Sequence, residues 1–176
     1  RSLGALASSY PFVLYSDLYD HNVFIRSLVN SGFSGLLWSP EMRSCGSKKD
    51  LIRRLQTVVF SAHSLINAWN CAEIIPWSIH DCEDEARELL RAAFDRYEAT
   101  GYPPVRALVM DFTDDPETYK IDTEYMFCDN LLVAPLTAAS DTRKVYLPAG
   151  QWVDLFTREP IEAGWHEITT EQIQVF

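Results

Sequence analysis

Gly32-Phe33-Ser34-Gly35-Leu36-Leu37-Trp38 is a short, largely apolar stretch of the kind that forms a buried strand. It is followed by the polar stretch Ser39 to Ser47 and then by Lys48 to His63. In this last segment apolar residues recur at the 3.6-residue period of a helix, at Leu51, Leu55, Val58, Val59 and Ala62. A buried strand that leads into an amphipathic helix is typical of a parallel βαβ unit.

The same alternation continues on both sides of this stretch. Upstream, apolar Phe12 to Tyr15 predicts a strand and Val23 to Asn30 predicts a helix. Downstream, Leu65 to Trp69 predicts a third strand. Glu83 to Thr100 predicts a helix with acidic residues in its first turn and Gly101 just past its end. The N-terminal part is therefore predicted to be α/β with parallel strands.

The pattern changes after Pro103-Pro104. Short strand-like segments now follow one another with turn residues between them, and no helical pattern interrupts them. These segments are Val105–Phe112, Asn130–Leu136, Lys144–Leu147, Gln151–Leu155, Trp165–Ile168 and the apolar end Ile173–Phe176. We place a domain boundary near Tyr102, with an α/β part at residues 1–101 and an antiparallel, sandwich-like β domain at residues 102–176.

Composition limits the function classes. The chain has 176 residues, of which 47% are hydrophobic, and its 15 basic and 25 acidic residues give a net charge of −10. This charge argues against nucleic acid and anionic membranes as partners. No apolar run reaches the ~18 residues of a membrane span. Three βα units cannot close a barrel of eight, and both ends are cut close to strand-like segments. We therefore expect the rest of a longer chain to be a partner of this one.

The cysteines argue against a metal site. Cys45, Cys71, Cys82 and Cys128 form no C-x-x-C pair, and no histidine lies at metal-ligand spacing from them. Scattered single cysteines favour a reducing compartment, so the cytoplasm is favoured over export. We expect neither a metal nor a cofactor.

Polar and aromatic side chains follow the three predicted strands, where the active face of a parallel α/β array lies. Carboxylates, amides and guanidinium groups bind sugar hydroxyls, and tryptophan offers a flat apolar face to a sugar ring. A carboxyl group close to aromatic rings can also stay protonated and act as a general acid. The residues are Asp17, Asp20 and His21 after the first strand, Trp38, Glu41 and Arg43 after the second, and Asn67, Trp69 and Asn70 after the third.

Structural alternatives exist for each group. Asp17 or Asp20 could cap the helix that starts near Asn22. Asp17, Asp20 and His21 could form half of a metal site. Glu41 and Arg43 could be a surface ion pair, and Trp38 and Trp69 could be core residues.

Several segments resemble one known family. Gly32 to Leu36, followed by Trp38-Ser39-Pro40-Glu41, resembles the seventh-strand region of glycoside hydrolase family 31, and Phe60-Ser61 resembles its approach to strand eight. The most specific likeness is Tyr125-Met126-Phe127-Cys128-Asp129-Asn130-Leu131-Leu132-Val133-Ala134-Pro135, which resembles the family block Y-M-F-G-x-x-L-L-V-A-P. Pro104 to Leu108 and Val145 to Trp152 also fit, so the resemblance covers most of the chain in the right order.

The resemblance implies a retaining α-glycosidase, such as an α-glucosidase, α-xylosidase or α-galactosidase. Residues 1–101 would be the last βα units of a (β/α)8 TIM barrel, and residues 102–176 the proximal β domain. Ser16-Asp17-Leu18 is the best counterpart of the family's acid/base motif, so Asp17 is the implied acid/base and Asp20 its fallback. The nucleophile would lie upstream of Arg1, so the chain alone would be inactive.

The resemblance also implies the substrate contacts. Trp38, Glu41, Arg43, Asn67 and Trp69 would bind an oligosaccharide or glycoside. The family's Asp-Ile-Gly-Gly-Phe is replaced near Glu41-Met42-Arg43, and its Arg-x-His is replaced near Leu65-Ile66-Asn67. These departures leave the sugar open. The rival functions are a non-catalytic carbohydrate-binding or scaffold module and a metal-dependent hydrolase that uses Asp17, Asp20 and His21. A homo-oligomer also stays open.

Overall fold

The computed structural model describes residues 13–17, 20–35, 37–44, 47–61, 66–70 and 95–176, and for strands β1, β2 and β3 the description covers backbone and register. Strands β1 (Val13–Asp17), β2 (Leu37–Ser44) and β3 (Ile66–Asn70) form a parallel sheet in the order β1-β2-β3. Helices α1 (His21–Ser31) and α2 (Lys48–Val59) connect its strands. The predicted α/β pattern of the N-terminal part is confirmed for these elements.

Both helices begin where local side chains stabilise them. Asp20 is the N-cap of α1, and Ser47 is the N-cap of α2 through a hydrogen bond from the Asp50 backbone N–H to its hydroxyl, at 3.1 Å. The third predicted helix, Glu83 to Thr100, lies partly outside the described residues. Its last turn, at residues 95–100, is helical, and Gly101 caps it with φ of 74° and an N–H bond to the Tyr97 carbonyl at 2.8 Å.

The predicted strand at Gly32 to Trp38 is wrong in its first half. Gly32–Ser34 form a 3-10 helix, η2, and β2 begins only at Leu37. The reason is tertiary: a Cβ at position 32 would lie 2.6 Å from the Val105 carbonyl oxygen, so the glycine lets the end of α1 approach the next domain. The polar stretch after Trp38 belongs to the strand as far as Ser44, because β2 continues along its parallel partners.

The C-terminal part is built mainly of antiparallel strands. Its central sheet has the order β11-β6-β5-β4, and β7 pairs with β10 and β8 with β9. The strands are β4 (Val105–Ala107), β5 (Tyr125–Phe127), β6 (Leu131–Ala134), β7 (Thr142–Leu147), β8 (Trp152–Val153), β9 (Pro160–Ile161), β10 (Gly164–Thr169) and β11 (Gln174–Val175). This arrangement is consistent with the expected β-sandwich.

One prediction for this part is wrong. Val105 to Phe112 is not a single strand: β4 ends at Ala107, and helix α4 (Leu108–Asp111) follows, then the 3-10 helix η4 (Pro116–Lys120). The Arg106 side chain is 2% exposed and pairs with Asp111 at 2.7 Å. An ion pair five residues apart closes a turn that a continuous strand would hold open.

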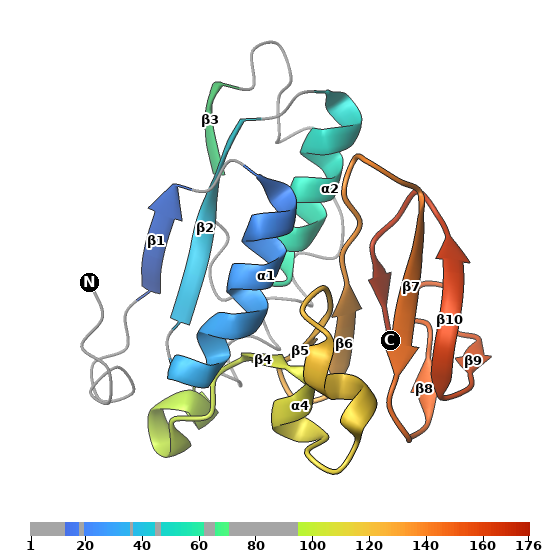
Figure 1. Ribbon diagram of the computed structural model, residues 1–176. Coiled ribbons are helices and arrows are strands. Elements are labelled where there is room, and N and C mark those ends of the chain that lie inside the picture. Colours follow the sequence, from blue (N-terminus) through green and yellow to red (C-terminus); the bar gives the residue numbers. More distant parts are fainter. Residues whose placement is uncertain (1–12, 18–19, 36, 45–46, 62–65, 71–94) are drawn as a thin grey trace.

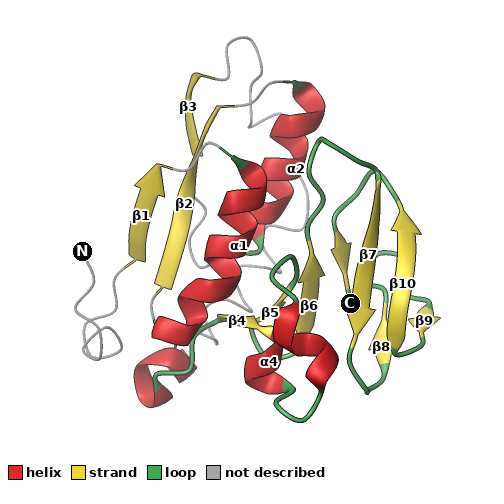
Figure 2. Ribbon diagram, in the orientation of Figure 1, coloured by secondary structure: helices red, strands yellow, loops and turns green. Residues whose placement is uncertain are grey.

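Three layers result, with α1 and α2 between the parallel sheet and the antiparallel strands (Figures 1 and 2). The central antiparallel sheet is buried on both faces. One face packs on α1 and α2, and its members include Tyr125, Phe127, Val133 and Val175. The other face packs on β7 and β8 and includes Met126, Leu132 and Ala134. Alternate residues of each strand therefore serve different cores.

Polar contacts join the helices to the β domain. Arg53 of α2 is 1% exposed, and its guanidinium donates to the carbonyls of Thr137 and Ser140 and to the Asp141 carboxylate. The Tyr125 hydroxyl donates to the Phe60 carbonyl at 2.8 Å. Because these donors are buried, their loss would leave unpaired polar groups at the junction.

Candidate active site

The predicted acid/base stands at the end of a parallel strand. Asp17 is the last residue of β1, and it pairs in register with Glu41 of β2. The α1 helix follows four residues later, so Asp17 lies where β1 passes into its crossover. In parallel α/β folds this carboxyl end of the sheet carries the functional side chains.

The remaining predicted residues lie within strands rather than after them, which corrects the expected placement. Trp38, Glu41 and Arg43 belong to β2, and Asn67 and Trp69 belong to β3. The physical reason is that parallel pairing extends the ladder beyond the apolar stretch, since Met42 pairs with Ile66 and Ser44 with Asn70. Glu41 and Asn67 are therefore each one residue from the paired positions Met42 and Ile66.

Asp20 has a structural partner. Its carboxylate accepts a hydrogen bond from the Val23 backbone N–H at 2.9 Å, and its side chain is exposed at the start of α1. This is the N-cap contact that the sequence left open as an alternative for Asp20. A carboxylate committed to a helix end is a poorer candidate for proton transfer than Asp17.

His21, the first residue of α1, is buried and also has a structural partner. Its Nε2 lies 2.9 Å from the Thr57 hydroxyl of α2, and that hydroxyl donates to the Arg53 carbonyl at 2.9 Å. Because the single hydroxyl proton is used there, Nε2 of His21 must be the donor, and the ring carries its proton on Nε2. Burial, reinforced by the charge of Arg54, lowers the pKa of His21 to about 4. Thr57 carries no local signal, because its partner is 36 residues away.

The contacts of Asp20 and His21 are relevant to the metal site that the sequence left open as an alternative. Within the described ranges, no group of three or more His, Cys, Asp and Glu side chains is placed to hold a metal ion. Asp20 and His21 already serve the α1 cap and the contact between helices. The geometry therefore favours a structural role for this pair.

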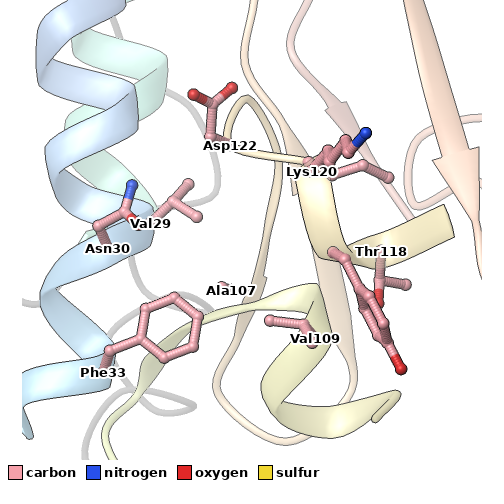
Figure 3. Close-up of a pocket in the computed structure, with 10 residues that line it drawn as sticks. Val29, Asn30, Phe33, Ala107, Val109, Thr118, Lys120 and Asp122 are labelled. Atoms are coloured by element: carbon pink, nitrogen blue, oxygen red, sulfur yellow. The ribbon is translucent and has the colours of Figure 1, made fainter. Parts of the chain in front are cut away.

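A shallow cavity of about 230 Å³ lies at the opposite end of α1 from Asp17 (Figure 3). Val29, Asn30 and Phe33 line one side, and Ala107, Val109 and the segment Thr118–Asp122 line the other. Asp122 at its rim forms an ion pair with Arg26 at 3.1 Å. Since α1 separates this cavity from the end of β1, the cavity is not the predicted catalytic cleft.

Comparison with known proteins identifies the β part. Residues 101–176 match the family described as "Glycosyl hydrolase family 31 C-terminal domain". This match shows a likeness of the β part to glycoside hydrolase family 31. The resemblance inferred from the Tyr125 to Pro135 block is thereby confirmed. The division at residues 101 and 102 stays a prediction.

Curated glycosidases are similar to parts of this chain. The chain is 35% identical over 86 residues to "Alpha-glucosidase 2" of Bacillus thermoamyloliquefaciens, covering 48% of this chain and 11% of the relative. It is 46% identical over 66 residues to "Alpha-xylosidase" of Saccharolobus solfataricus, covering 36% of this chain and 9% of the relative. The chain thus spans about a tenth of the length of these relatives.

A solved family 31 structure extends the likeness to both parts of the chain. The crystal structure of a GH31 alpha-xylosidase from a soil metagenome, complexed with xylose, superposes with a TM-score of 0.69 at 26% identity. The alignment covers 86% of this chain and 29% of that chain.

Among the described residues, no helix has the length and apolarity needed to cross a membrane.

Proposed function

We propose that this chain is the C-terminal part of the catalytic unit of a retaining α-glycosidase that hydrolyses terminal α-linked sugars. Strands β1, β2 and β3, with α1 and α2, are the last βα units of its (β/α)8 barrel, and residues 102–176 are its proximal β domain. The proposal is supported by the family 31 match of residues 101–176 and by the parallel order β1-β2-β3.

Asp17 is the acid/base. It protonates the leaving oxygen of the substrate and then activates the water that attacks the glycosyl-enzyme ester. The observation that carries this role is the position of Asp17 at the carboxyl end of β1, in register with Glu41. Glu41, Arg43 and Asn67 bind sugar hydroxyls, and Trp38 and Trp69 bind sugar faces.

The second carboxylate of the reaction comes from another part of the protein. Retention needs two carboxyl groups roughly 5 Å apart, and this chain holds no counterpart of the family's nucleophile motif. Activity therefore belongs to the full-length protein, and the 176-residue chain by itself should turn over no α-glycoside.

The experiment is the variant Asp17→Ala in the full-length protein. Activity on alkyl α-glucosides, α-xylosides and α-galactosides should fall by roughly 10²–10⁴-fold, because their leaving groups need a proton. The first step on dinitrophenyl glycosides should be spared, because the dinitrophenolate departs without a proton. Azide should then restore turnover of these activated substrates and yield the glycosyl azide, because a small anion needs no base.

Asp20→Ala is the matched control three residues away. It should lose about 1 kcal/mol of stability, because the cap of α1 is removed, and it should show no azide rescue. Rescue of Asp20→Ala with simple destabilisation of Asp17→Ala would move the acid/base to Asp20. Absence of rescue in both variants would refute both assignments.

A further inference from the structure

The outward face of the β7–β10 pair carries two aromatic rings side by side. Tyr146 and Trp165 are directly opposite in the antiparallel register, and their ring centroids lie 5.1 Å apart at an interplanar angle of 45°. The neighbours Val145 and Leu147 point inward and are fully buried, whereas Trp165 is 52% exposed. The indole therefore presents a large apolar surface to solvent.

Two carboxylates from the η4 region fix these rings from their polar ends. The Tyr146 hydroxyl donates to Asp115 at 2.7 Å, and the Trp165 indole N–H donates to Glu117 at 2.9 Å. Asp115 is itself fixed as the N-cap of η4. The hydrogen bond to Asp115 raises the pKa of Tyr146 to about 12, so the phenol stays protonated. The Tyr146 and Trp165 rings are thus held in place before any ligand binds, which reduces the entropy lost on binding.

The remaining groups on this face fit hydroxyls. Lys144 and Glu167 are the next outward pair of the same ladder, so a donor and an acceptor stand beside the rings. Within the described part of the chain, Oε1 of Glu117 accepts no hydrogen bond, and a carboxylate oxygen can accept two. An apolar face bordered by donors and acceptors matches a sugar ring, whose C–H face is apolar and whose rim is hydroxylated.

We propose that Trp165, Tyr146, Glu117 and Asp115 form a surface binding site for a neutral oligosaccharide. A sugar ring stacks on Trp165 and donates hydroxyls to Glu117. Asp115, Glu117 and Glu167 repel anionic ligands, and the exposed indole face beside hydroxyl acceptors fits a neutral sugar. This site is separate from Asp17, because α1 and α2 lie between the parallel sheet and the β7–β10 pair (Figure 1).

The test measures binding by calorimetry in the full-length protein carrying Asp17→Ala, so that turnover does not interfere. Maltoheptaose and a xyloglucan heptasaccharide are the probes. Trp165→Ala should weaken binding of at least one probe tenfold or more, and Trp165→Phe should weaken it less because a ring remains. Phe33→Ala is the matched control, since Phe33 is 56% exposed beside α1, and it should leave binding unchanged.

The same variants separate this site from the catalytic one. In the otherwise unaltered protein, Trp165→Ala should leave kcat/KM on a small aryl glycoside unchanged. Equal affinity of parent and Trp165→Ala for both probes would overturn the proposal, as would binding of trilysine that depends on Trp165. Protection of Trp165 from acrylamide quenching in the full-length protein would also overturn it, because another part of the chain would then cover the ring.

Discussion

Asp17 and Glu41 are partners in the parallel register of β1 and β2. Adjacent strands lie about 4.8 Å apart, so the backbone at the end of β1 lies beside the middle of β2. The register thereby links the proposed acid/base to one of the proposed substrate-binding residues.

Glu41→Gln in the full-length protein should raise KM for an α-glycoside more than it lowers kcat. The proposed role of the Glu41 carboxylate is to accept hydrogen bonds from sugar hydroxyls, and an amide is a weaker acceptor. The measurement is kcat and KM on a small α-glycoside. Glu98→Gln, an exposed glutamate in the helix at residues 95–100, is the control and should leave both constants unchanged. An unchanged KM in Glu41→Gln would contradict the proposed role of Glu41.

His21 should make the protein less stable in acid. Its pKa is about 4 in the folded protein and near 6.5 when unfolded, so the unfolded state binds the extra proton between these values. The contribution of His21 to the free energy of unfolding is therefore fully present above pH 6.5. It is lost as the pH drops toward 4, by about 3 kcal/mol at most. Urea unfolding as a function of pH measures the loss.

His21→Gln should remove this part of the acid dependence, although it also costs stability at neutral pH because the buried contact with Thr57 changes. His166→Gln is the control, because His166 is only partly buried and bonds to the Glu162 carbonyl through its ring. An acid dependence that survives His21→Gln and disappears in His166→Gln would show that the wrong histidine was chosen.

Cys128 occupies a backbone conformation that favours glycine. Its φ is 54°, and it stands where the family block Y-M-F-G-x-x-L-L-V-A-P has glycine. Cys128→Gly and Cys128→Ala both remove the buried thiol, but only the first removes the Cβ. We expect Cys128→Gly to be more stable than Cys128→Ala by about 1–2 kcal/mol, measured by denaturant unfolding. Equal stability would mean that the left-handed conformation costs nothing here.

Arg53 should be essential to the junction between α2 and the β domain. Arg53→Met removes the buried guanidinium that donates to the Thr137 and Ser140 carbonyls, and it should cost about 3 kcal/mol in unfolding free energy. Asp141→Asn should cost less, because the Asp141 side chain is 43% exposed and water can replace it. Lys49→Ala removes the exposed partner of the same carboxylate and is the control for surface charge. A larger loss in Lys49→Ala than in Arg53→Met would contradict this order.

The sequence by itself determined the elements whose pattern repeats over many residues. The apolar periodicity of Lys48 to His63 predicted α2, and the acidic first turn with Gly101 predicted a helix end that the structure confirms at residue 101. Longer strands such as Thr142–Leu147 and Gly164–Thr169 were also found, because alternation needs several residues to be read. The Tyr125 to Pro135 block carried the family.

Tertiary structure decided the features that depend on distant partners. The turn at Gly32 exists because the chain packs on Val105, and β2 continues through polar residues because β1 and β3 pair with it. Arg53 and Arg106 are buried against sequence expectation, since their carboxylate and carbonyl partners come together only on folding. Local sequence also left Asp20 open between cap and acid. The hydrogen bond from the Val23 backbone N–H shows that Asp20 caps α1, and this contact forms only because α1 begins at His21.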